Sequence, residues 1–209
     1  WLPRDIVLTN NSGAHGAKAE DSCAWAIGAL NAGLPTILAN QRAHRWEPVF
    51  TTPVAGKTVV VLGFGDLGSA AGRAAKKLDR AVSVKQLDRV LPLADFFVVT
   101  TPLTPETRGL VTRERLNLLK PGCGFINIGR AAIVDYDALR TKLAKGDLCG
   151  AVLDVFPQEP MPADSPWWDT PGVIAVPHVT CDDPRYIDQL FDMWFDNFDR
   201  LLTGRRLRH

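Results

Sequence analysis

The chain has no long apolar run, almost no net charge and only four cysteines among its 209 residues. Because 24 Lys and Arg balance 23 Asp and Glu to a formal charge of +1, nothing indicates a basic surface for nucleic acid or anionic membranes. No apolar stretch reaches the roughly 20 residues of a membrane span, and no export signal opens the chain. These absences predict a cytoplasmic protein with neither nucleic-acid nor membrane partners.

The scarcity of cysteine argues against a disulfide framework. Cys23, Cys123, Cys149 and Cys181 are scattered without the C-x-x-C spacing of metal or redox sites. We therefore expect reduced, mostly buried thiols and no metal site, with a nucleophilic cysteine as the minor alternative. The 46% hydrophobic content is enough for a core of ordinary size.

The most informative short pattern is a glycine-rich turn between a strand and a helix. The apolar, β-branched run Val59–Leu62 predicts a buried parallel strand, and Ser69–Leu78 predicts a helix. Between them, Gly63, Gly65 and Gly68 form G-x-G-x-x-G. This spacing permits a tight turn, close approach of a pyrophosphate to the backbone and close packing of helix on strand. The position between strand and helix favours a dinucleotide site over a merely glycine-rich turn.

Strands and helices alternate along most of the remaining chain. Further strand candidates are Phe96–Thr100, Gly124–Ile128, Ala151–Val155 and Val173–Val176. This alternation predicts an α/β fold with a doubly wound, Rossmann-like parallel sheet. Outside this region we expect a short strand at Ile6–Leu8 and helices at 18–32, 35–45 and 183–202.

Charged side chains follow several of these strands. In a doubly wound sheet, ligands bind beyond the carboxyl ends of the strands. Arg130, Asp154 and His178 stand at such ends, and Glu159 lies shortly after Asp154. Taken singly, each has a structural explanation: a solvated turn arginine, a helix cap, a surface acid or a packed histidine. Because all four gather at one edge of one sheet, we expect a functional site.

Six segments of the chain match motifs of one enzyme family. They are LGFGDLG at 62–68, TPLTPETRGL at 101–110, LKPGCGFINIGRAAIVD at 119–135, GAVLDVFPQEP at 150–160, PADSPWWDTP at 162–171 and PHVTCDDP at 177–184. Together they cover most of 56–184 and are far more specific than the glycine turn alone. By these segments the chain resembles the D-isomer-specific 2-hydroxyacid dehydrogenases, particularly their glyoxylate/hydroxypyruvate reductase-like members.

The resemblance implies an enzyme that interconverts a small 2-oxo acid and a D-2-hydroxy acid with NAD or NADP, assembled as a homodimer. It assigns catalysis to Arg130, Glu159 and His178, and substrate binding to Arg130 and the turn Ser12-Gly13. Asp66 and Leu67 would offer backbone N–H groups to the pyrophosphate, and Asp154 would lie near the nicotinamide. The implied cofactor-binding set is Gly63, Gly65, Asp66, Leu67, Gly68, Thr101, Pro102, Ile128, Gly129, Arg130, Asp154 and His178.

The chemistry requires these residue types. Reduction of a 2-oxo acid needs a proton donor beside the carbonyl oxygen, and His178 titrates in the right range. Glu159 would hydrogen-bond the other ring nitrogen and favour the imidazolium. Arg130 would fork onto the substrate carboxylate, which a lysine cannot do.

The chain departs from the family pattern in its domain content. We divide it into 1–47, the end of a flavodoxin-like substrate domain with linking helices, 48–181, the dinucleotide-binding domain, and 182–209, a helix returning to the substrate domain. Only remnants of the substrate domain are present, so the sequence does not reveal which 2-oxo acid is preferred. We therefore expect the intact protein to be longer than 209 residues.

A second departure concerns the second strand of the sheet, whose end usually carries the residue that contacts the adenosine ribose. One interpretation makes Arg80–Val84 this strand, with Lys85 and Gln86 at the ribose. The other places the strand and its loop in a gap between Leu78 and Asp79. We favour the gap, because residues 79–92 resemble the family segment that follows the strand. The choice between NAD and NADP therefore stays open.

A competing function is a dinucleotide-sensing binding module, as in the co-repressors that resemble this family. Those relatives also keep the set Arg130, Glu159 and His178, so the set favours an enzyme without excluding the module. Turnover of 2-oxo acids separates the two functions.

Overall fold

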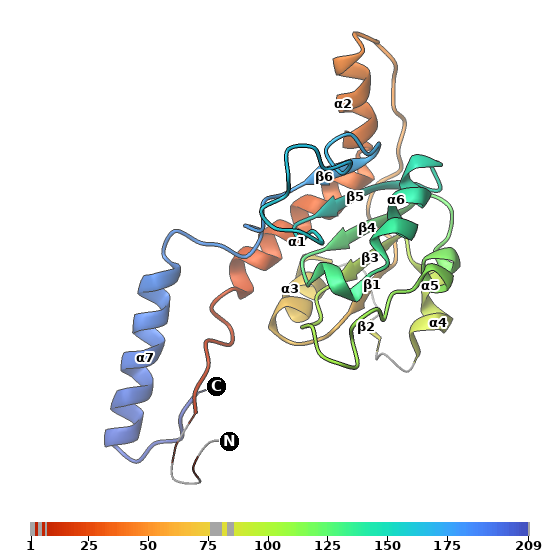
Figure 1. Ribbon diagram of the computed structural model, residues 1–209. Helices are drawn as coiled ribbons and strands as arrows, with labels where there is room; N and C mark the ends of the chain where they lie inside the picture. Colours follow the sequence, from red (N-terminus) through yellow and green to blue (C-terminus); the bar gives the residue numbers. More distant parts are fainter. Residues whose placement is uncertain (1–2, 4–5, 7, 76–80, 83–85, 209) are drawn as a thin grey trace.

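The computed structural model describes residues 3, 6, 8–75, 81–82 and 86–208. Its centre is a sheet of six parallel strands in the order β2-β1-β3-β4-β5-β6, with helices on both faces (Figure 1). This arrangement confirms the predicted α/β, doubly wound fold. The strands are β1 Val59–Leu62, β2 Ala81–Val82, β3 Phe96–Val99, β4 Cys123–Asn127, β5 Leu148–Leu153 and β6 Val173–Ala175.

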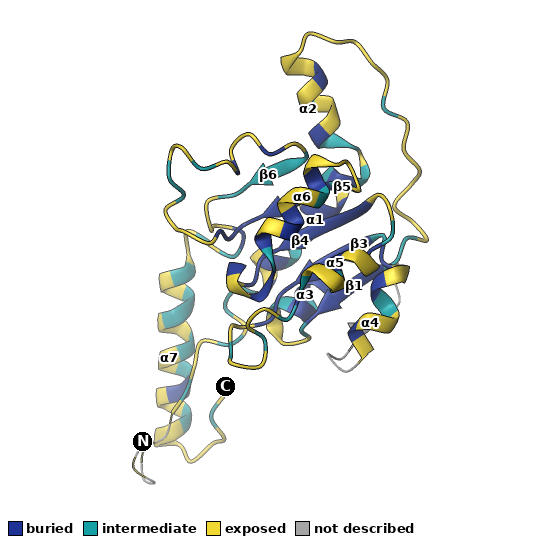
Figure 2. Ribbon diagram, turned by 45° about the vertical axis from the view of Figure 1, so that its right-hand side comes forward, coloured by how far each residue is buried: buried dark blue, intermediate teal, exposed yellow. Residues whose placement is uncertain are grey.

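The central strands are apolar because both of their faces are covered. Every residue of β1, β3 and β4 is buried, as Figure 2 shows by the dark blue centre of the sheet. Side chains alternate between the faces, so Val60 and Leu62 belong to one core and Val59 and Val61 to the other. The sheet therefore separates two hydrophobic cores.

One core lies under α4 (Leu87–Val90), α5 (Arg113–Leu118) and α6 (Tyr136–Ala144). Thr112 and Asp135 begin the last two of these helices, because each side chain accepts a hydrogen bond from a backbone N–H of the first turn. Short 3₁₀ turns at Leu91–Leu93 and Ala131–Ile133 complete this layer.

The other core lies under α1 (Gly16–Asn31) and α3 (Asp66–Ala74). Cys23, Ile27 and Leu30 of α1 are buried against the strands. The segment that precedes residue 48 thus supplies part of the core of the sheet domain. The division of the chain into 1–47, 48–181 and 182–209 stays a prediction.

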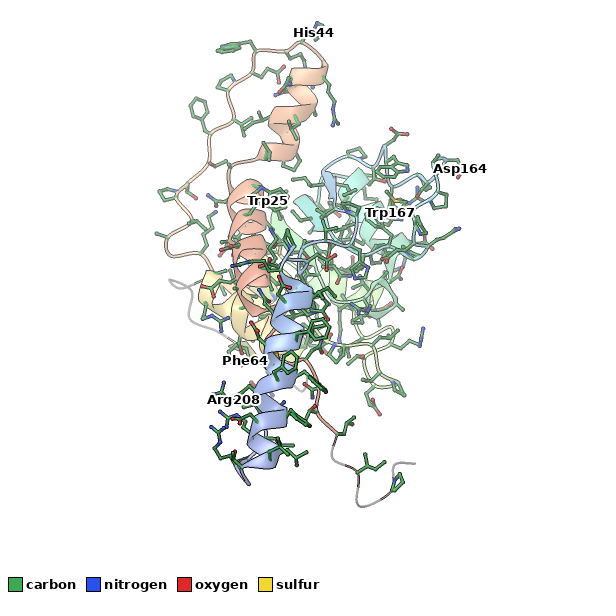
Figure 3. The ribbon with its side chains drawn as sticks, turned by 90° about the vertical axis from the view of Figure 1, so that its left-hand side faces the viewer. Trp25, His44, Phe64, Asp164, Trp167 and Arg208 are labelled. Carbon is green, nitrogen blue, oxygen red and sulfur yellow. The ribbon has the colours of Figure 1, made fainter. Side chains whose placement is uncertain are left out.

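Two helices extend away from the sheet. α2 (Leu34–Arg42) projects at one end of the molecule, and His44 lies at the tip of this arm (Figure 3). α7 (Tyr186–Leu202) lies apart from the sheet, beside the N-terminal segment (Figures 1 and 2). Thr9, Asn10 and Asn11 line a hollow against α7.

The structure corrects two sequence predictions. A second strand exists, because Ala81 and Val82 pair in parallel with Val61 and Leu62 of β1. This short strand satisfies the backbone edge of β1 that a gap would have left open. At the predicted Ile6–Leu8 strand, Val7 lies outside the described residues, and Ile6 and Leu8 are exposed and lie in no strand. No strand among the described residues pairs with them.

Some predicted features lie partly outside the described residues. This holds for the end of the predicted helix at 69–78 and for Lys85, the candidate ribose contact, whereas Gln86 is exposed and precedes α4. Among the described helices, none is by itself long and apolar enough to cross a membrane, and α1 and α2 meet those criteria only as a pair bent by 62°. The described residues contain no cluster of three or more His, Cys, Asp or Glu that would suit a metal ion.

Candidate functional site

The strand order places a topological switch point at the carboxyl ends of β1 and β3. The chain passes from β1 to β2 on one side and then crosses to β3 on the other. Such a reversal opens a binding crevice beyond the carboxyl ends of the two strands. Gly63 follows β1 there, and Thr100 and Thr101 follow β3.

The glycine turn at 63–68 is fixed by steric contacts that no side chain would permit. Gly63 has φ of 98°, and a Cβ on it would lie 2.8 Å from Cγ2 of Thr101. A Cβ on Gly68 would lie 2.0 Å from the carbonyl oxygen of Gly63. Around Gly65, in contrast, the space within 4 Å of a Cβ is open. The first and third glycines thus shape the turn, while the second leaves room for a ligand.

The helix that follows this turn begins at the switch point with backbone donors that no described side chain caps. α3 begins at Asp66 after Gly65, and no side chain of the described residues caps its first turn. The helix N-terminus therefore offers backbone N–H groups and a partial positive charge to an anion.

Two threonines at the end of β3 face the same turn. Thr100 Oγ1 donates to the carbonyl oxygens of Leu62 and Gly63, at 3.0 and 3.2 Å. Thr101 is 7% exposed, and its Oγ1 has no hydrogen-bond partner among the described residues. A buried hydroxyl without a partner is costly, which suits a position that a ligand completes.

A buried asparagine holds the turn that carries Arg130. Asn127, the last residue of β4, accepts a hydrogen bond from the Gly129 N–H at 3.0 Å and donates to the Tyr136 hydroxyl at 3.1 Å. The Tyr136 hydroxyl in turn donates to the carbonyl of Val155 at 2.5 Å. This network fixes the ends of β4 and β5 relative to each other, with the Arg130 residue exposed at the edge.

Glu159 and His178 form a hydrogen-bonded pair. Nδ1 of His178 lies 2.7 Å from Oε2 of Glu159, while Oε1 of Glu159 accepts the Phe156 N–H at 2.8 Å. Burial acts to raise the pKa of the Glu159 carboxyl, but these hydrogen bonds and the charges of His178 and Arg130 hold that pKa below its usual value. The pair therefore combines a carboxylate with an imidazole whose Nε2 faces away from it.

Asp154 holds the backbone that follows His178. Its residue is 2% exposed, and Oδ1 accepts the N–H groups of Val179 at 2.8 Å and Thr180 at 3.1 Å. Oδ2 accepts the Thr180 hydroxyl at 2.5 Å. His178 itself has a φ of 54°, a left-handed conformation that is unusual outside glycine.

Two hollows flank the Glu159–His178 pair. One, of about 730 Å³, is lined by both residues together with Asp154, Met161 and Trp168. The other, of about 630 Å³, is lined by Glu159 and Arg130. Glu159 thus lies between a hollow that carries the imidazole and one that carries the guanidinium.

The predicted substrate loop lies against the glycine turn. The Ser12 hydroxyl donates to the Asp66 carboxylate, and Gly13 has φ of 93°. No hydrogen bond between described residues joins Ser12 to Arg130 or His178. A contact of Ser12 and Gly13 with substrate therefore stays a prediction, as do the individual roles of the other site residues.

The pKa values of all four cysteine thiols are raised by burial. All four are free, and Cys23 and Cys123 are buried. Burial, followed by the neighbouring Cys181, raises the pKa of the Cys23 thiol to about 12, and burial also raises the pKa of Cys181. Raised pKa values favour the protonated thiols, and the free, buried Cys23 and Cys123 agree with the predicted reduced and buried cysteines.

Comparison with known proteins identifies the family. Residues 73–180 match the model of the D-isomer specific 2-hydroxyacid dehydrogenase, NAD binding domain. The chain belongs to the D-isomer specific 2-hydroxyacid dehydrogenase family.

Relatives within this family include both sequences and solved structures. The chain is 40% identical over 148 residues to glyoxylate/hydroxypyruvate reductase B of Pectobacterium carotovorum, in a match that covers 62% of this chain and 46% of that protein. A D-isomer specific 2-hydroxyacid dehydrogenase of Xanthobacter autotrophicus, solved with NADPH and MES, has a TM-score of 0.85 and 30% identity over 97% of this chain and 90% of that one. The NADPH-dependent glyoxylate/hydroxypyruvate reductase of Sinorhizobium meliloti, solved with NADP and sulfate, has a TM-score of 0.83 and 26% identity over all of this chain and 72% of that one. The chain spans about half the length of the Pectobacterium relative.

Sequence reasoning missed several residues that support the site in this family member. Asn127 and Tyr136 fix the Arg130 turn, and Thr180 completes the partners of Asp154. A single asparagine at the end of the apolar run CGFIN was a usable signal, because a polar side chain that ends a buried strand needs a local partner. Thr180 carried no comparable signal in the sequence.

Proposed function

We propose that the protein reduces a small 2-oxo acid to a D-2-hydroxy acid, reversibly, with NADH or NADPH. The observation that carries this proposal is the Glu159–His178 pair, with Nδ1 and Oε2 at 2.7 Å, beside Arg130 and the glycine turn of one sheet edge. The names of the relatives, glyoxylate/hydroxypyruvate reductases among them, support a short 2-oxo acid as substrate.

The residues at the switch point of the sheet fit a dinucleotide. The turn at Gly63 and Gly68 admits no Cβ, the N-terminus of α3 is uncapped, and the Thr101 hydroxyl lacks a partner. When bound, the reduced nicotinamide supplies the hydride that adds to the carbonyl carbon. The N–H groups of Asp66 and Leu67 would bind the pyrophosphate.

Three side chains perform the remaining chemistry. Arg130 binds the substrate carboxylate with its planar fork and orients the carbonyl group. His178 donates a proton from Nε2 to the carbonyl oxygen, because Nδ1 is held by Glu159. The carboxylate of Glu159 stabilises the imidazolium that this step requires. In the oxidative direction the neutral imidazole accepts the proton.

A turnover assay tests this function. The protein is mixed with NADH or NADPH and a panel of 2-oxo acids that includes glyoxylate and hydroxypyruvate, and loss of the reduced nicotinamide absorbance is followed. We expect His178→Ala to lower kcat by about 10²–10⁴-fold with little change in cofactor affinity. His44→Ala is the matched control, since His44 lies at the tip of the α2 arm (Figure 3).

Two outcomes of this assay would contradict the proposal. Near-parental turnover by His178→Ala would remove the assigned proton donor. Cofactor binding without turnover of any acid in the panel would favour a dinucleotide-sensing module, an alternative that the reductases and dehydrogenases among the relatives do not support.

The proposal extends to assembly and location. We infer a cytoplasmic homodimer without nucleic-acid or membrane partners. The formal charge of +1 and the exposed apolar side chains of α7 and of the α2 arm support this inference.

A further inference from the structure

The turn that carries His178 is held from two sides. On the inner side, Asp154 binds the Val179 and Thr180 N–H groups and the Thr180 hydroxyl. On the outer side, Ser22 of α1 donates to the Thr180 carbonyl at 2.7 Å. Every one of these contacts acts on residues 179–180, directly after the histidine, so the sheet and α1 fix this backbone together.

This support matches the unusual conformation of His178. A φ of 54° is unfavourable for a residue with a β-carbon, and persists only where the surroundings impose it. The ring is held separately, since Glu159 binds Nδ1. The two carboxylates that follow β5 thus have different contacts. Asp154 binds the backbone of the turn after His178, and Glu159 binds the imidazole ring.

Thr180 has a particular place in this arrangement. It is 5% exposed, and it gives Asp154 both its N–H and its hydroxyl. Asp154 is itself 2% exposed, and a buried carboxylate depends on hydrogen bonds to replace water. The hydroxyl is the partner of Oδ2, whereas both backbone N–H groups bind Oδ1. Removal of the hydroxyl would therefore leave Oδ2 without this partner and free the carboxylate to rotate.

We propose that Thr180 is a positioning residue for His178, acting through the carboxylate of Asp154. The proposal rests on the proposed function of His178 as proton donor. The hydroxyl of Thr180 fixes the orientation of the Asp154 carboxylate, and that carboxylate fixes the backbone of the 178–180 turn. That turn sets the direction in which Nε2 of His178 delivers its proton.

The test compares Thr180→Val, which keeps the shape and lacks the hydroxyl, with Thr180→Ser, which keeps the hydroxyl. In Thr180→Val we expect kcat for 2-oxo acid reduction to fall about tenfold, equivalent to one lost hydrogen bond to a charged group, while KM for the cofactor stays near the parental value. The alkaline limb of the pH dependence of kcat for reduction should move to lower pH, because the imidazole of His178 is less well held against Glu159. Thr180→Ser should restore both properties.

A second readout does not depend on turnover. We expect NMR spectra of the ligand-free protein to show altered ring resonances of His178 and faster amide exchange of Val179 in Thr180→Val, with parental values in Thr180→Ser. Thr170→Val is the matched control, because Thr170 is also buried but its hydroxyl donates to the carbonyl of Pro166. If Thr180→Val does not fold, Thr180→Ala takes its place.

The outcomes separate this proposal from the proposed function. Parental kcat, pH profile and His178 resonances in Thr180→Val would overturn the positioning role. A change in stability alone, with an unmoved pH profile and unchanged His178 resonances, would also overturn it. If the parent protein reduces no acid yet the His178 resonances respond to Thr180→Val, the positioning contact holds and the proposed function fails.

Discussion

At the scale of single residues, the glycines of the 63–68 turn have separable roles. A Cβ on Gly68 would meet the Gly63 carbonyl oxygen at 2.0 Å, so Gly68→Ala forces the backbone to shift. We expect this variant to lose about 1–3 kcal/mol of unfolding free energy, the usual range for a clash in a packed region, and to bind NAD(P)H weakly. Thermal unfolding and a fluorescence titration measure the two effects.

Gly65→Ala is the matched comparison. Its Cβ would meet no atom within 4 Å, so the fold has room for it, whereas the bound pyrophosphate needs the same space. We expect parental stability with weakened cofactor binding. Equal losses of stability in the two variants would contradict the separation of shape from ligand access.

Glu159→Gln tests the charge behind the imidazole. The hydrogen bond and charge of His178 help to hold the pKa of Glu159 below its usual value, against the opposing effect of burial. Such coupling is reciprocal, so the carboxylate favours the protonated ring by the same interaction. Because Gln carries no charge, we expect reductive activity to be lost at a lower pH than in the parent. The pH dependence of kcat/KM measures this shift.

Glu114→Gln provides the control for that experiment, since it removes an exposed carboxylate at the start of α5. The alkaline limb of the pH dependence of kcat/KM for Glu114→Gln should coincide with that of the parent. If the limb of Glu159→Gln also coincided with the parental one, Glu159 would have no part in proton transfer.

At the scale of secondary-structure elements, Asp95 ties three strands together at their amino ends. Its Oδ2 accepts the Thr58 N–H at 2.7 Å before β1, and its Oδ1 lies 2.7 Å from Nζ of Lys120 before β4. Burial acts to raise the pKa of Asp95, but the hydrogen bonds from Lys120 and Thr58 outweigh it and lower that pKa. The folded state thus favours the carboxylate.

Asp95→Asn should therefore destabilise the protein in a pH-dependent way. A pKa lowered by folding gives stabilisation that is complete above the unfolded value of about 3.9 and is lost as the pH falls through the folded value. We expect a loss of about 1–2 kcal/mol at pH 7 that shrinks toward zero in acid, measured by urea unfolding across pH. Asp164→Asn, on an exposed loop, should change little at any pH. A loss for Asp95→Asn that is independent of pH would exclude an ionic origin.

The elements differed in how well their sequences predicted them. β1 and β3 were predicted almost to the residue, because buried parallel strands are continuous apolar runs bounded by turn residues. β2 was predicted absent because residues 79–92 resemble the family segment that follows this strand, but Ala81 and Val82 pair with β1 within that segment. A strand was also predicted at Ile6–Leu8, but a short apolar run forms a strand only where another strand pairs with it, and Ile6 and Leu8 lie in none.

Residues of the candidate site could be predicted from the sequence only where a charged or titratable side chain follows the end of a strand. Arg130, Asp154 and His178 could be found in this way, and Glu159 by its place shortly after Asp154. The structure joins Glu159 and His178 directly. The partners that orient them lie in contacts between distant segments, such as Thr180 with Asp154. Those contacts depend on the packing of β5 against β6 and not on any local pattern.

At the scale of the whole molecule, α7 exposes an aromatic cluster away from the sheet. Trp194 is 56% exposed and packs on Phe195 and Phe198, with ring centroids 5.1 and 5.6 Å apart. Ile187, Phe191 and Leu202 are exposed on the same helix. An apolar face of this kind drives association, since burial of one large side chain contributes about 1.5–3 kcal/mol.

We therefore expect the 209-residue chain to self-associate through α7 at micromolar concentrations. Trp194→Lys removes the centre of the aromatic cluster and adds a charge, so it should weaken association by about tenfold or more in sedimentation velocity. Trp46→Ser is the control, because Trp46 is fully exposed near the α2 arm and lies outside α7. A parent chain that stays monomeric would refute the prediction. If Trp46→Ser dissociates the oligomer and Trp194→Lys does not, the contact between copies lies at the α2 arm. The reason is that only an aromatic side chain buried between two copies contributes to the affinity of one copy for the other.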